Sequence, residues 1–294
     1  EVSAGSVSNI LTKTADQFEQ EFDDLVLAGL NSTAYQQTDD TSARVAGEFW
    51  HTHVLCNPYY AAYFTLPTRD RFAVLAVLQN TQELHYLLNK TTRDLLRNDF
   101  IVPEKWQRRL EELGDVQLDQ PSMDQLLGDW FKTSNRQLRV SIAHAAAIVY
   151  YRQQSAVPVV QTLVCDDAPQ FKLLTENLAL CWIHEGRHYE RLTPVVRRHA
   201  EMLESFVERF WDYYSSLQDY RAGPNDERAA ELRREFDELM STRTGYKALD
   251  DRIATTAGNK ADLLTVLSIP TVPLHNNASE LLARVSARRR DVSL

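Results

Sequence analysis

The sequence predicts a mixed α/β fold in which two long helical segments interrupt one small sheet. Three observations predict it. Residues 33–66 are rich in Thr, Val, Tyr, Phe and Trp and are divided by turn residues into strand-like runs. Residues 157–165 form a short apolar run rich in β-branched side chains, which is typical of a buried strand. Most of the remaining chain shows the apolar spacing of helices.

The elements of the first quarter are expected in the following order. Apolar residues recur at spacings of three and four over residues 8–30, which predicts one amphipathic helix. Three strands joined by turns follow within residues 33–66, and the breaks are Asp39-Asp40, Gly47 and Asn57-Pro58. A helix capped by Thr68 is expected to run to Leu78.

The later elements alternate between helical blocks and short strands. Residues 80–155 are predicted to be helical, with breaks near Pro103 and Pro121. The strand of residues 157–165 follows, and residues 177–186 predict another strand leading into a helix. The last elements are helices over 194–245 with a turn at 223–225, a short helix at 259–267, a Pro-rich loop over 268–277 and a final helix over 278–290.

This order divides the chain into a core and two insertions. The six expected parts are an N-terminal helix leading into the core (1–32), a first part of the core with three strands and a helix (33–79), a helical insertion (80–156), a second part of the core (157–193), a second helical insertion (194–268) and a last core helix (269–294).

The composition is that of an ordinary globular protein, with 294 residues and a net charge of -9. Taken alone, this charge argues against a protein that binds nucleic acid without sequence preference. The acidic excess is concentrated in residues 1–100, whereas residues 181–199 are locally basic. A nucleic-acid partner therefore remains compatible with the sequence.

The remaining bulk features indicate a protein of a reducing compartment. Three cysteines are too few for a disulfide framework. No apolar run approaches the roughly 18 residues of a membrane span, and the first ten residues carry no signal-peptide pattern. We therefore expect a cytoplasmic protein without a membrane partner. Because the chain begins at Glu1, flanking segments are expected to be missing.

Acidic residues stand at three structurally meaningful points. Asp39 follows a strand-like run, Asp166 follows the buried strand, and Glu280 lies in the first turn of the final helix. Carboxylates that neighbouring strands bring together repel one another unless a cation lies between them. Mg²⁺ or Mn²⁺ suits such oxygen ligands. The alternative to a metal site is that each acid only stabilises a turn. Within a metal site, Asp40 and Asp167 are the alternatives to their neighbours Asp39 and Asp166 as ligands.

Four segments in order carry a resemblance to a known family. They are TDDTSARVAG (38–47), LVCDDAPQF (163–171), LALCWIHEGRHYERL (178–192) and PLHNNASELLARVSARRR (273–290). Together they resemble the DDE transposases of bacterial insertion sequences, most closely the insertion-sequence-sixty-six type. The resemblance runs from about Glu21 to Arg290. It departs from the family at Leu281, where an Arg usually follows the catalytic Glu.

The resemblance implies an RNase H-like mixed sheet with large α-helical insertions. It implies that Asp39, Asp166 and Glu280 are catalytic and bind two Mg²⁺ or Mn²⁺ ions. The expected activity is hydrolysis of a phosphodiester at a transposon end, followed by transfer of the strand to target DNA. Transposon ends and target DNA are the expected partners, together with further copies of the chain when active, in the bacterial cytoplasm at the nucleoid.

Two other functions fit the same residues. A related metal-dependent nuclease would cleave DNA without joining strands. A domesticated or inactive relative would only bind DNA.

A C-x-x-H pair, Cys181 and His184, matches a pair found between the second and third acids of many DDE transposases. The alternative is a core cysteine beside a structural histidine. Two ligands do not complete a zinc site, which takes four. The segment HTHVLC is the candidate source of more, through His51, His53 and Cys56.

Basic and amide side chains near the acids are candidates for DNA contact. Arg187, Arg191 and Arg284 are expected to contact phosphates, which position DNA without reading its sequence. Asn276 and Asn277 are expected to cap the last helix and to help place Glu280 or the DNA.

Overall fold

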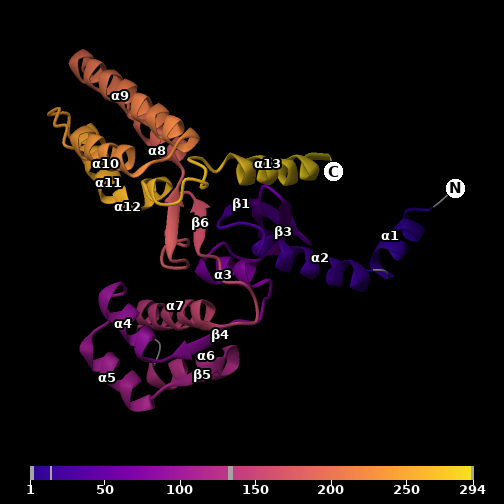
Figure 1. Cartoon of the computed structure of the whole chain (residues 1–294). Coiled ribbons are helices and arrows are strands. Elements are labelled where there is room, and N and C mark those ends of the chain that lie inside the picture. Colours follow the sequence, from indigo (N-terminus) through magenta and orange to yellow (C-terminus); the bar gives the residue numbers. More distant parts are fainter. Residues whose placement is uncertain (1–2, 14, 132–134, 293–294) are drawn as a thin grey trace.

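The computed structural model describes residues 3–13, 15–131 and 135–292, and it confirms the predicted mixed α/β fold (Figure 1). One five-stranded sheet has the order β3-β2-β1-β6-β7. Its strands are β1 (Gln36–Val45), β2 (Glu48–Asn57), β3 (Tyr60–Leu66), β6 (Thr162–Cys165) and β7 (Asn177–Leu180).

The sheet is mixed, with β1 at its centre. β1, β2 and β3 form an antiparallel meander, whereas β6 pairs with β1 in parallel and β7 pairs with β6 in parallel. Parallel neighbours need a long crossover connection, which the helices between β3 and β6 supply. β6 is fully buried, as its apolar sequence predicts, but it covers only the second half of the predicted strand.

Asp39 and Asp40 lie inside β1, so the predicted turn at this pair is wrong. Antiparallel pairing continues through both residues, which lie opposite Val54 and His53 of β2. The backbone hydrogen bonds between β1 and β2 therefore override the turn preference of Asp. The sheet also fixes the backbone positions from which both carboxylates project.

The helix that follows the meander is α3 (Arg71–Gln79). Its cap is Asp70 and not Thr68: the Asp70 carboxylate accepts a 3.1 Å hydrogen bond from the Ala73 amide. A carboxylate at this position satisfies one of the free amides of the first turn and favours the helix dipole, which makes Asp70 the better cap.

The segment predicted as an all-helical insertion over 80–156 also contains two strands. β4 (His85–Leu88) and β5 (Val116–Asp119) form a separate antiparallel pair. Four residues each with weak alternation were too short to stand out between helices. The helices are α4 (Lys90–Asn98), α5 (Glu104–Leu113), α6 (Gln120–Trp130) and α7 (Arg136–Gln153), and α7 packs on β4, α3 and α4.

The second insertion is helical, as predicted, and its first two helices are separated at residues 223–225. Trp182, at the start of α8 (Trp182–Glu190), is fully buried against Phe210 and Tyr213 of this block. Its indole N–H donates to the Leu263 carbonyl at 2.9 Å. The elements are α9 (Arg197–Ala222), α10 (Asp226–Met240), α11 (Lys247–Gly258), α12 (Lys260–Leu263) and a 3₁₀ turn (Thr265–Leu267).

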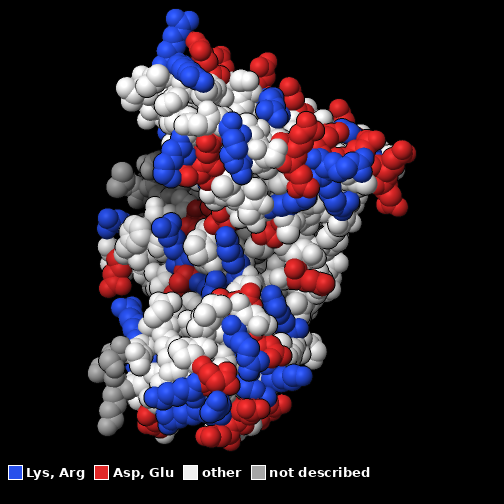
Figure 2. Space-filling model, turned by 90° about the vertical axis from the view of Figure 1, so that its left-hand side faces the viewer, with Lys and Arg blue, Asp and Glu red and all other residues white. Residues whose placement is uncertain are grey.

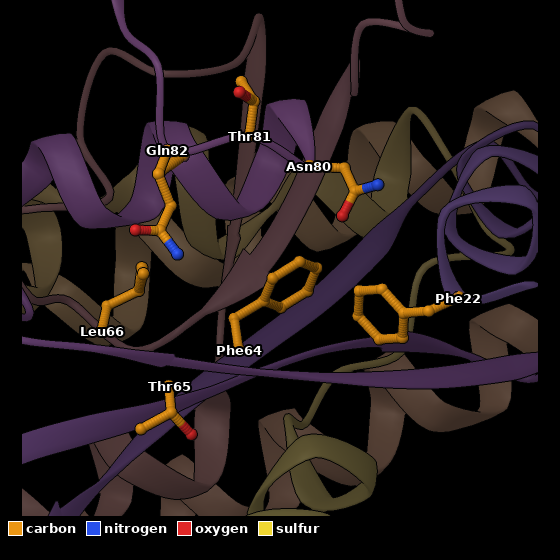
Figure 3. A pocket seen from close by; sticks show the side chains of 8 residues that line it. Phe22, Phe64, Thr65, Leu66, Asn80, Thr81 and Gln82 are labelled. Carbon is orange, nitrogen blue, oxygen red and sulfur yellow. The ribbon is translucent and has the colours of Figure 1, made fainter. Parts of the chain in front are cut away.

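α1 (Ala4–Lys13) and α2 (Ala15–Leu30) occupy the region predicted as one helix, and residue 14 between them lies outside the described part of the chain. Phe22 of α2 meets Phe64 of β3 edge to face, with ring centroids 5.3 Å apart. Both rings line a cavity of about 270 Å³ (Figure 3). The packing of α2 on β3 thus fixes one edge of the sheet.

The last helix, α13 (Asn277–Val292), lies along β1 and β2 (Figure 1). Its Ala283 packs against Val54 and Cys56, so α13 covers the face of the sheet to which these two residues point. In the part of the chain that the structure describes, no helix is both long and apolar enough to cross a membrane.

Candidate functional site

The alternation of β1 decides which of its two acids faces α13. Paired residues of adjacent strands share a face, so Asp39 lies on the face of its partner Val54, beneath α13. Asp40 lies on the opposite face with His53, and its carboxylate is 3.9 Å from Nδ1 of His51. Only the first acid of the pair therefore points toward the last helix.

Asp166 reaches the same side of the sheet from β6. Val164 pairs with Gln37 of β1, so continued alternation places Asp166 on the face of Asp39. The Asp166 carboxylate accepts a 3.1 Å hydrogen bond from the Ala168 amide. The neighbouring Asp167 carboxylate instead forms an ion pair with Lys172, with the two atoms 2.7 Å apart.

Glu280 is held over the sheet by a buried contact one turn earlier. The side-chain amide of Asn276, which is 1 % exposed, donates to the Thr38 carbonyl at 2.7 Å. The Glu280 carboxylate is 11 % exposed and has different neighbours at its two oxygens. Oε1 lies 3.7 Å from Nδ1 of His184, and Oε2 lies 3.5 Å from Arg187 and 3.7 Å from Arg284.

The electrostatics of the acids show that they share one neighbourhood. The pKa of Asp39 is raised to about 7: burial is the main cause, one backbone hydrogen bond opposes the rise, and the nearby carboxylates of Asp40, Asp166 and Glu280 contribute to it. Burial also raises the pKa of Asp166, while His184 opposes that shift. Such shifts mark negative charge that the protein itself does not compensate.

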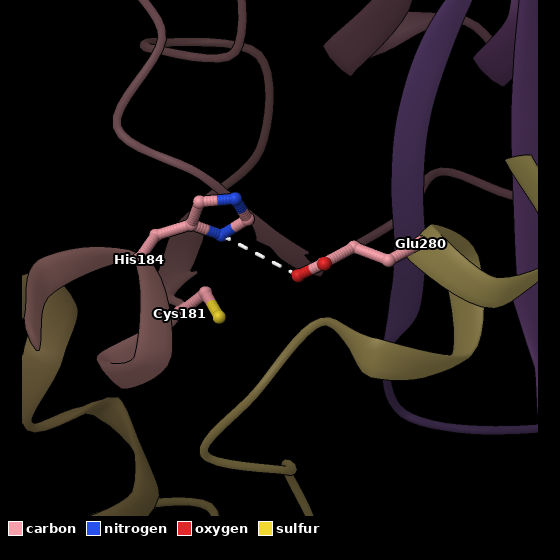
Figure 4. Close-up of side chains that lie close together, drawn as sticks. All are labelled: Cys181, His184 and Glu280. Carbon is pink, nitrogen blue, oxygen red and sulfur yellow. Dashed lines mark ion pairs between the residues drawn. The ribbon is translucent and has the colours of Figure 1, made fainter. Parts of the chain in front are cut away.

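The three acids are not, however, the tightest group of potential ligands. Among the residues with described positions, one set of three or more such groups comes within 4.8 Å of one another, and it is Cys181, His184 and Glu280 (Figure 4). Glu280 thus belongs to the neighbourhood of Asp39 and also to the cluster of the C-x-x-H pair, and Asp166 lines one pocket together with that pair.

A pocket of about 450 Å³ opens beside this centre. Its walls combine acids at the end of β6 with basic side chains of α8 and α11. The residues that line it are Asp166, Asp167, Ala168, Leu180, Cys181, His184, Glu185, His188, Arg191 and Arg252.

The residues predicted to contact DNA separate into two groups. Arg284 and Arg191 are exposed, and Arg187 is half-buried beside Glu280, so their guanidinium groups remain near the surface. Asn277 is exposed, whereas Asn276 is buried and its side-chain amide donates to the Thr38 carbonyl. Asn276 does not cap α13 with its side chain as predicted, because that side chain spans to β1.

Charge on the face that Figure 2 draws is mixed rather than segregated. Figure 2 shows Lys and Arg interspersed with Asp and Glu over the face drawn, without a broad area of one sign. On this face, attraction for a polyanion would therefore come from local groups of basic side chains.

The zinc hypothesis for His51, His53 and Cys56 is wrong. His53 Nε2 bonds the Thr68 carbonyl at 2.9 Å, on the face of the sheet opposite α13. Cys56 packs beneath α13 on the other face. His51 and His53 therefore lie on one face of β2, whereas Cys56 lies on the other.

Sequence reasoning missed the buried ion pair between Glu185 and Arg252. Glu185 is 3 % exposed and accepts hydrogen bonds from Arg252 and from the Thr256 hydroxyl. This network fixes α8, the helix that carries His184, against α11. An acid one turn after Trp182 on the buried face of a helix was the signal that pointed to it.

Comparison with known proteins gives one relationship. No family model and no solved structure matches this chain. The chain is 31 % identical over 267 residues to the uncharacterized protein y4jO of Sinorhizobium fredii (strain NBRC 101917 / NGR234), covering 90 % of this chain and 82 % of that protein. This chain belongs to the y4jO family. The name of y4jO assigns no activity.

Proposed function

We propose that this chain is the catalytic core of a DDE-type transposase, which hydrolyses DNA at transposon ends and transfers the strand to target DNA. The observation that carries the proposal is that Asp39 and Asp166 lie on the face of the sheet that α13 covers with Glu280, where the charges of Asp166 and Glu280 act on Asp39. The three acids come from a central strand, its parallel neighbour and a much later helix, and their mutual repulsion contributes to the raised pKa of Asp39.

The strand order supports the same proposal. An antiparallel meander of three strands, extended beside its first strand by two parallel ones, is the arrangement of the RNase H-like fold. In that fold the first strand, the fourth strand and the last helix carry the acids. β1, β6 and α13 hold these places here, with helical insertions between them.

The donor set fits hard divalent cations. Carboxylate oxygens are the ligands that Mg²⁺ and Mn²⁺ prefer, and Oε1 of Glu280 is buried without a hydrogen-bond partner. Asp39, Asp166 and Glu280 would hold two such ions. Once bound, the ions would supply an activated water and would stabilise the leaving oxygen.

The remaining residues would position the substrate. Arg187 and Arg284 flank Glu280 and would contact phosphates of the DNA end, and the exposed Arg191 and Asn277 would add further contacts. Asn276 would set the height of Glu280 above Asp39. For the acids to share ions, the Glu280 carboxylate must rotate from His184 toward Asp39.

The wider setting forms part of the proposal. The active form would contain more than one copy of the chain, since two transposon ends must be brought together. The two helical insertions would support this assembly or the binding of the ends. The protein would act at the nucleoid of a bacterial cell.

The test is an assay of DNA cleavage and strand joining by the full-length protein on DNA with the ends of its own element, in Mg²⁺. We expect Asp39→Asn, Asp166→Asn and Glu280→Gln each to reduce both steps by at least about 100-fold, because each removes a ligand charge. The matched controls are Asp40→Asn and Asp167→Asn, which leave the first acid of each pair intact.

The outcomes separate the three candidate functions. Cleavage without joining would replace the proposal with a metal-dependent nuclease. DNA binding without cleavage would indicate an inactive relative. Equal losses in the Asp39 and Asp40 variants would refute the assignment of the acids.

A further inference from the structure

We propose that Cys181, His184 and Glu280 bind one transition-metal ion of the zinc type, at a site separate from the hard-metal site of the aspartates. The two sites would share Glu280. Nothing in this assignment of a metal site depends on DNA chemistry, so it goes beyond the proposed function.

The three ligands come from two helix starts that face each other (Figure 4). Cys181 is the residue before α8, and His184 lies three residues later, so both side chains project from one side of its first turn. Glu280 projects from the first turn of α13. Their ligand atoms all lie within 4.8 Å of one another.

Two of these atoms are buried and lack any hydrogen-bond partner. They are Nδ1 of His184 and Oε1 of Glu280, and they point at each other across 3.7 Å. A buried polar atom without a partner is costly and calls for an ion or another ligand. Cys181 forms no disulfide. Its sulfur accepts a 3.3 Å hydrogen bond from the backbone N–H of Asn276, the kind of contact that supports a thiolate ligand.

The donor set selects the class of metal. Sulfur and imidazole nitrogen are ligands of Zn²⁺ and similar ions, whereas Mg²⁺ prefers oxygen alone. Tetrahedral zinc places neighbouring ligand atoms about 3.5 Å apart, so the side chains need close by only about 1 Å. Binding would release the thiol proton of Cys181 to solvent and leave one position of the ion for water.

The surroundings of the histidine can adapt to the ion. Arg187 lies 3.3 Å from Nε2 of His184 and 3.5 Å from Oε2 of Glu280. An ion at Nδ1 leaves the histidine proton on Nε2, which can then no longer accept from Arg187. Arg187 would keep its contact with Oε2, and Glu280 would offer Oε1 to the ion.

Sharing Glu280 has a regulatory consequence, and this part rests on the proposed function. An ion of the zinc type would hold the Glu280 carboxylate beside His184. The aspartates would then lose their third ligand, so low concentrations of Zn²⁺ would inhibit DNA cleavage in Mg²⁺.

The test of the site is a Co²⁺ titration of the full chain followed by absorption spectroscopy. We expect one Co²⁺ per chain, a thiolate-to-cobalt charge-transfer band, and loss of the band when Zn²⁺ is added. Cys181→Ser should abolish the band, and His184→Ala and Glu280→Gln should weaken binding by about 10- to 100-fold. The matched control is Cys56→Ser, which changes another buried free cysteine and should keep the band.

Circular dichroism would confirm that each variant is folded. Absence of the band in the folded wild-type chain, or its persistence in Cys181→Ser, would overturn the site. Unchanged affinity in Glu280→Gln would remove Glu280 from it.

A second measurement tests the sharing of Glu280. Cleavage in Mg²⁺ would be compared with and without Zn²⁺, and Cys181→Ser should reduce the inhibition ratio. Cobalt binding combined with zinc-insensitive cleavage would refute the shared ligand alone. A chain that binds cobalt but never cleaves DNA would refute the proposed function while leaving the metal site intact.

Discussion

The side-chain amide of Asn276 and the backbone carbonyl of Thr38 are joined by a 2.7 Å hydrogen bond, although 238 residues separate them in sequence. Both residues are buried. Thr38 immediately precedes Asp39, and Asn276 lies one turn before Glu280. This bond therefore ties the backbone next to the first acid to the start of the helix that carries the third.

Asn276→Ala is expected to lower the free energy of unfolding by about 1 to 3 kcal/mol, because it leaves a buried carbonyl without its donor. Urea denaturation measures the change. The neighbouring exposed Asn277→Ala is the control and should change it by less than about 0.5 kcal/mol. Equal effects of the two substitutions would show that the contact with Thr38 contributes nothing.

The raised pKa of Asp39 predicts that stability falls as pH rises. Between the ordinary Asp value of 3.8 and about 7, the folded chain keeps a proton that the unfolded chain has lost. The folded state is therefore favoured at low pH, and the contribution fades through pH 7, by up to about 4 kcal/mol. Denaturation with a chelator present, at several pH values, measures this slope.

Asp39→Asn removes the titrating group and should flatten this part of the profile. At pH 8 the variant should be more stable than the wild type, and the two should converge near pH 4. The exposed Asp115→Asn serves as the control and should retain the wild-type slope. Parallel profiles for the wild type and Asp39→Asn would contradict the buried, charged environment of Asp39.

Arg252→Met is expected to lower stability by about 3 kcal/mol or more, since it leaves the buried Glu185 charge without its partner. The exposed pair of Arg197 and Glu201 provides the comparison, and Arg197→Met should cost less than about 0.5 kcal/mol. Thermal unfolding distinguishes the two. Similar melting temperatures would mean that the α8–α11 contact is not held by this ion pair.

Gly186→Ala is expected to destabilise the chain by about 1 to 3 kcal/mol, because the added methyl group would overlap the ring of Trp211. Gly128, in α6, has open space around the same position, so Gly128→Ala should instead stabilise the chain by about 0.5 to 1 kcal/mol. Opposite signs in chemical denaturation are the expected result. A gain in both variants would show that α8 and α9 can separate at no cost.

The sequence predicted the elements whose pattern is local and repeated. The three strands of residues 33–66 appear with the predicted turns at Gly47 and Asn57-Pro58 but without the one at Asp39-Asp40, and the pair of helices around residues 223–225 appears where its apolar spacing and turn residues placed it. β4 and β5 were missed because four residues give no clear period. Thr68 was predicted as the cap because Thr suits that position, but Asp70 suits it equally and is the cap in the structure.

Predicting the candidate site required knowing which face of the sheet each side chain occupies, and not only which strand or helix carries it. The choice between Asp39 and Asp40 needed the pairing of β1 with β2 and the side on which α13 lies, and neither is encoded locally. The same knowledge separated Cys56 from His51 and His53. The approach of Glu280 to Cys181 and His184 joins segments almost a hundred residues apart, which spacing alone does not reveal.

The long separation in sequence between Thr38 and Asn276 also determines at what stage of synthesis the site can form. On the ribosome, β1 emerges early, but its face stays uncovered until the second helical block has left the exit tunnel and α13 has docked. Closing so large a loop makes this docking a late step of folding. Under the proposed function, the nascent chain would therefore be unable to cleave DNA during most of its synthesis.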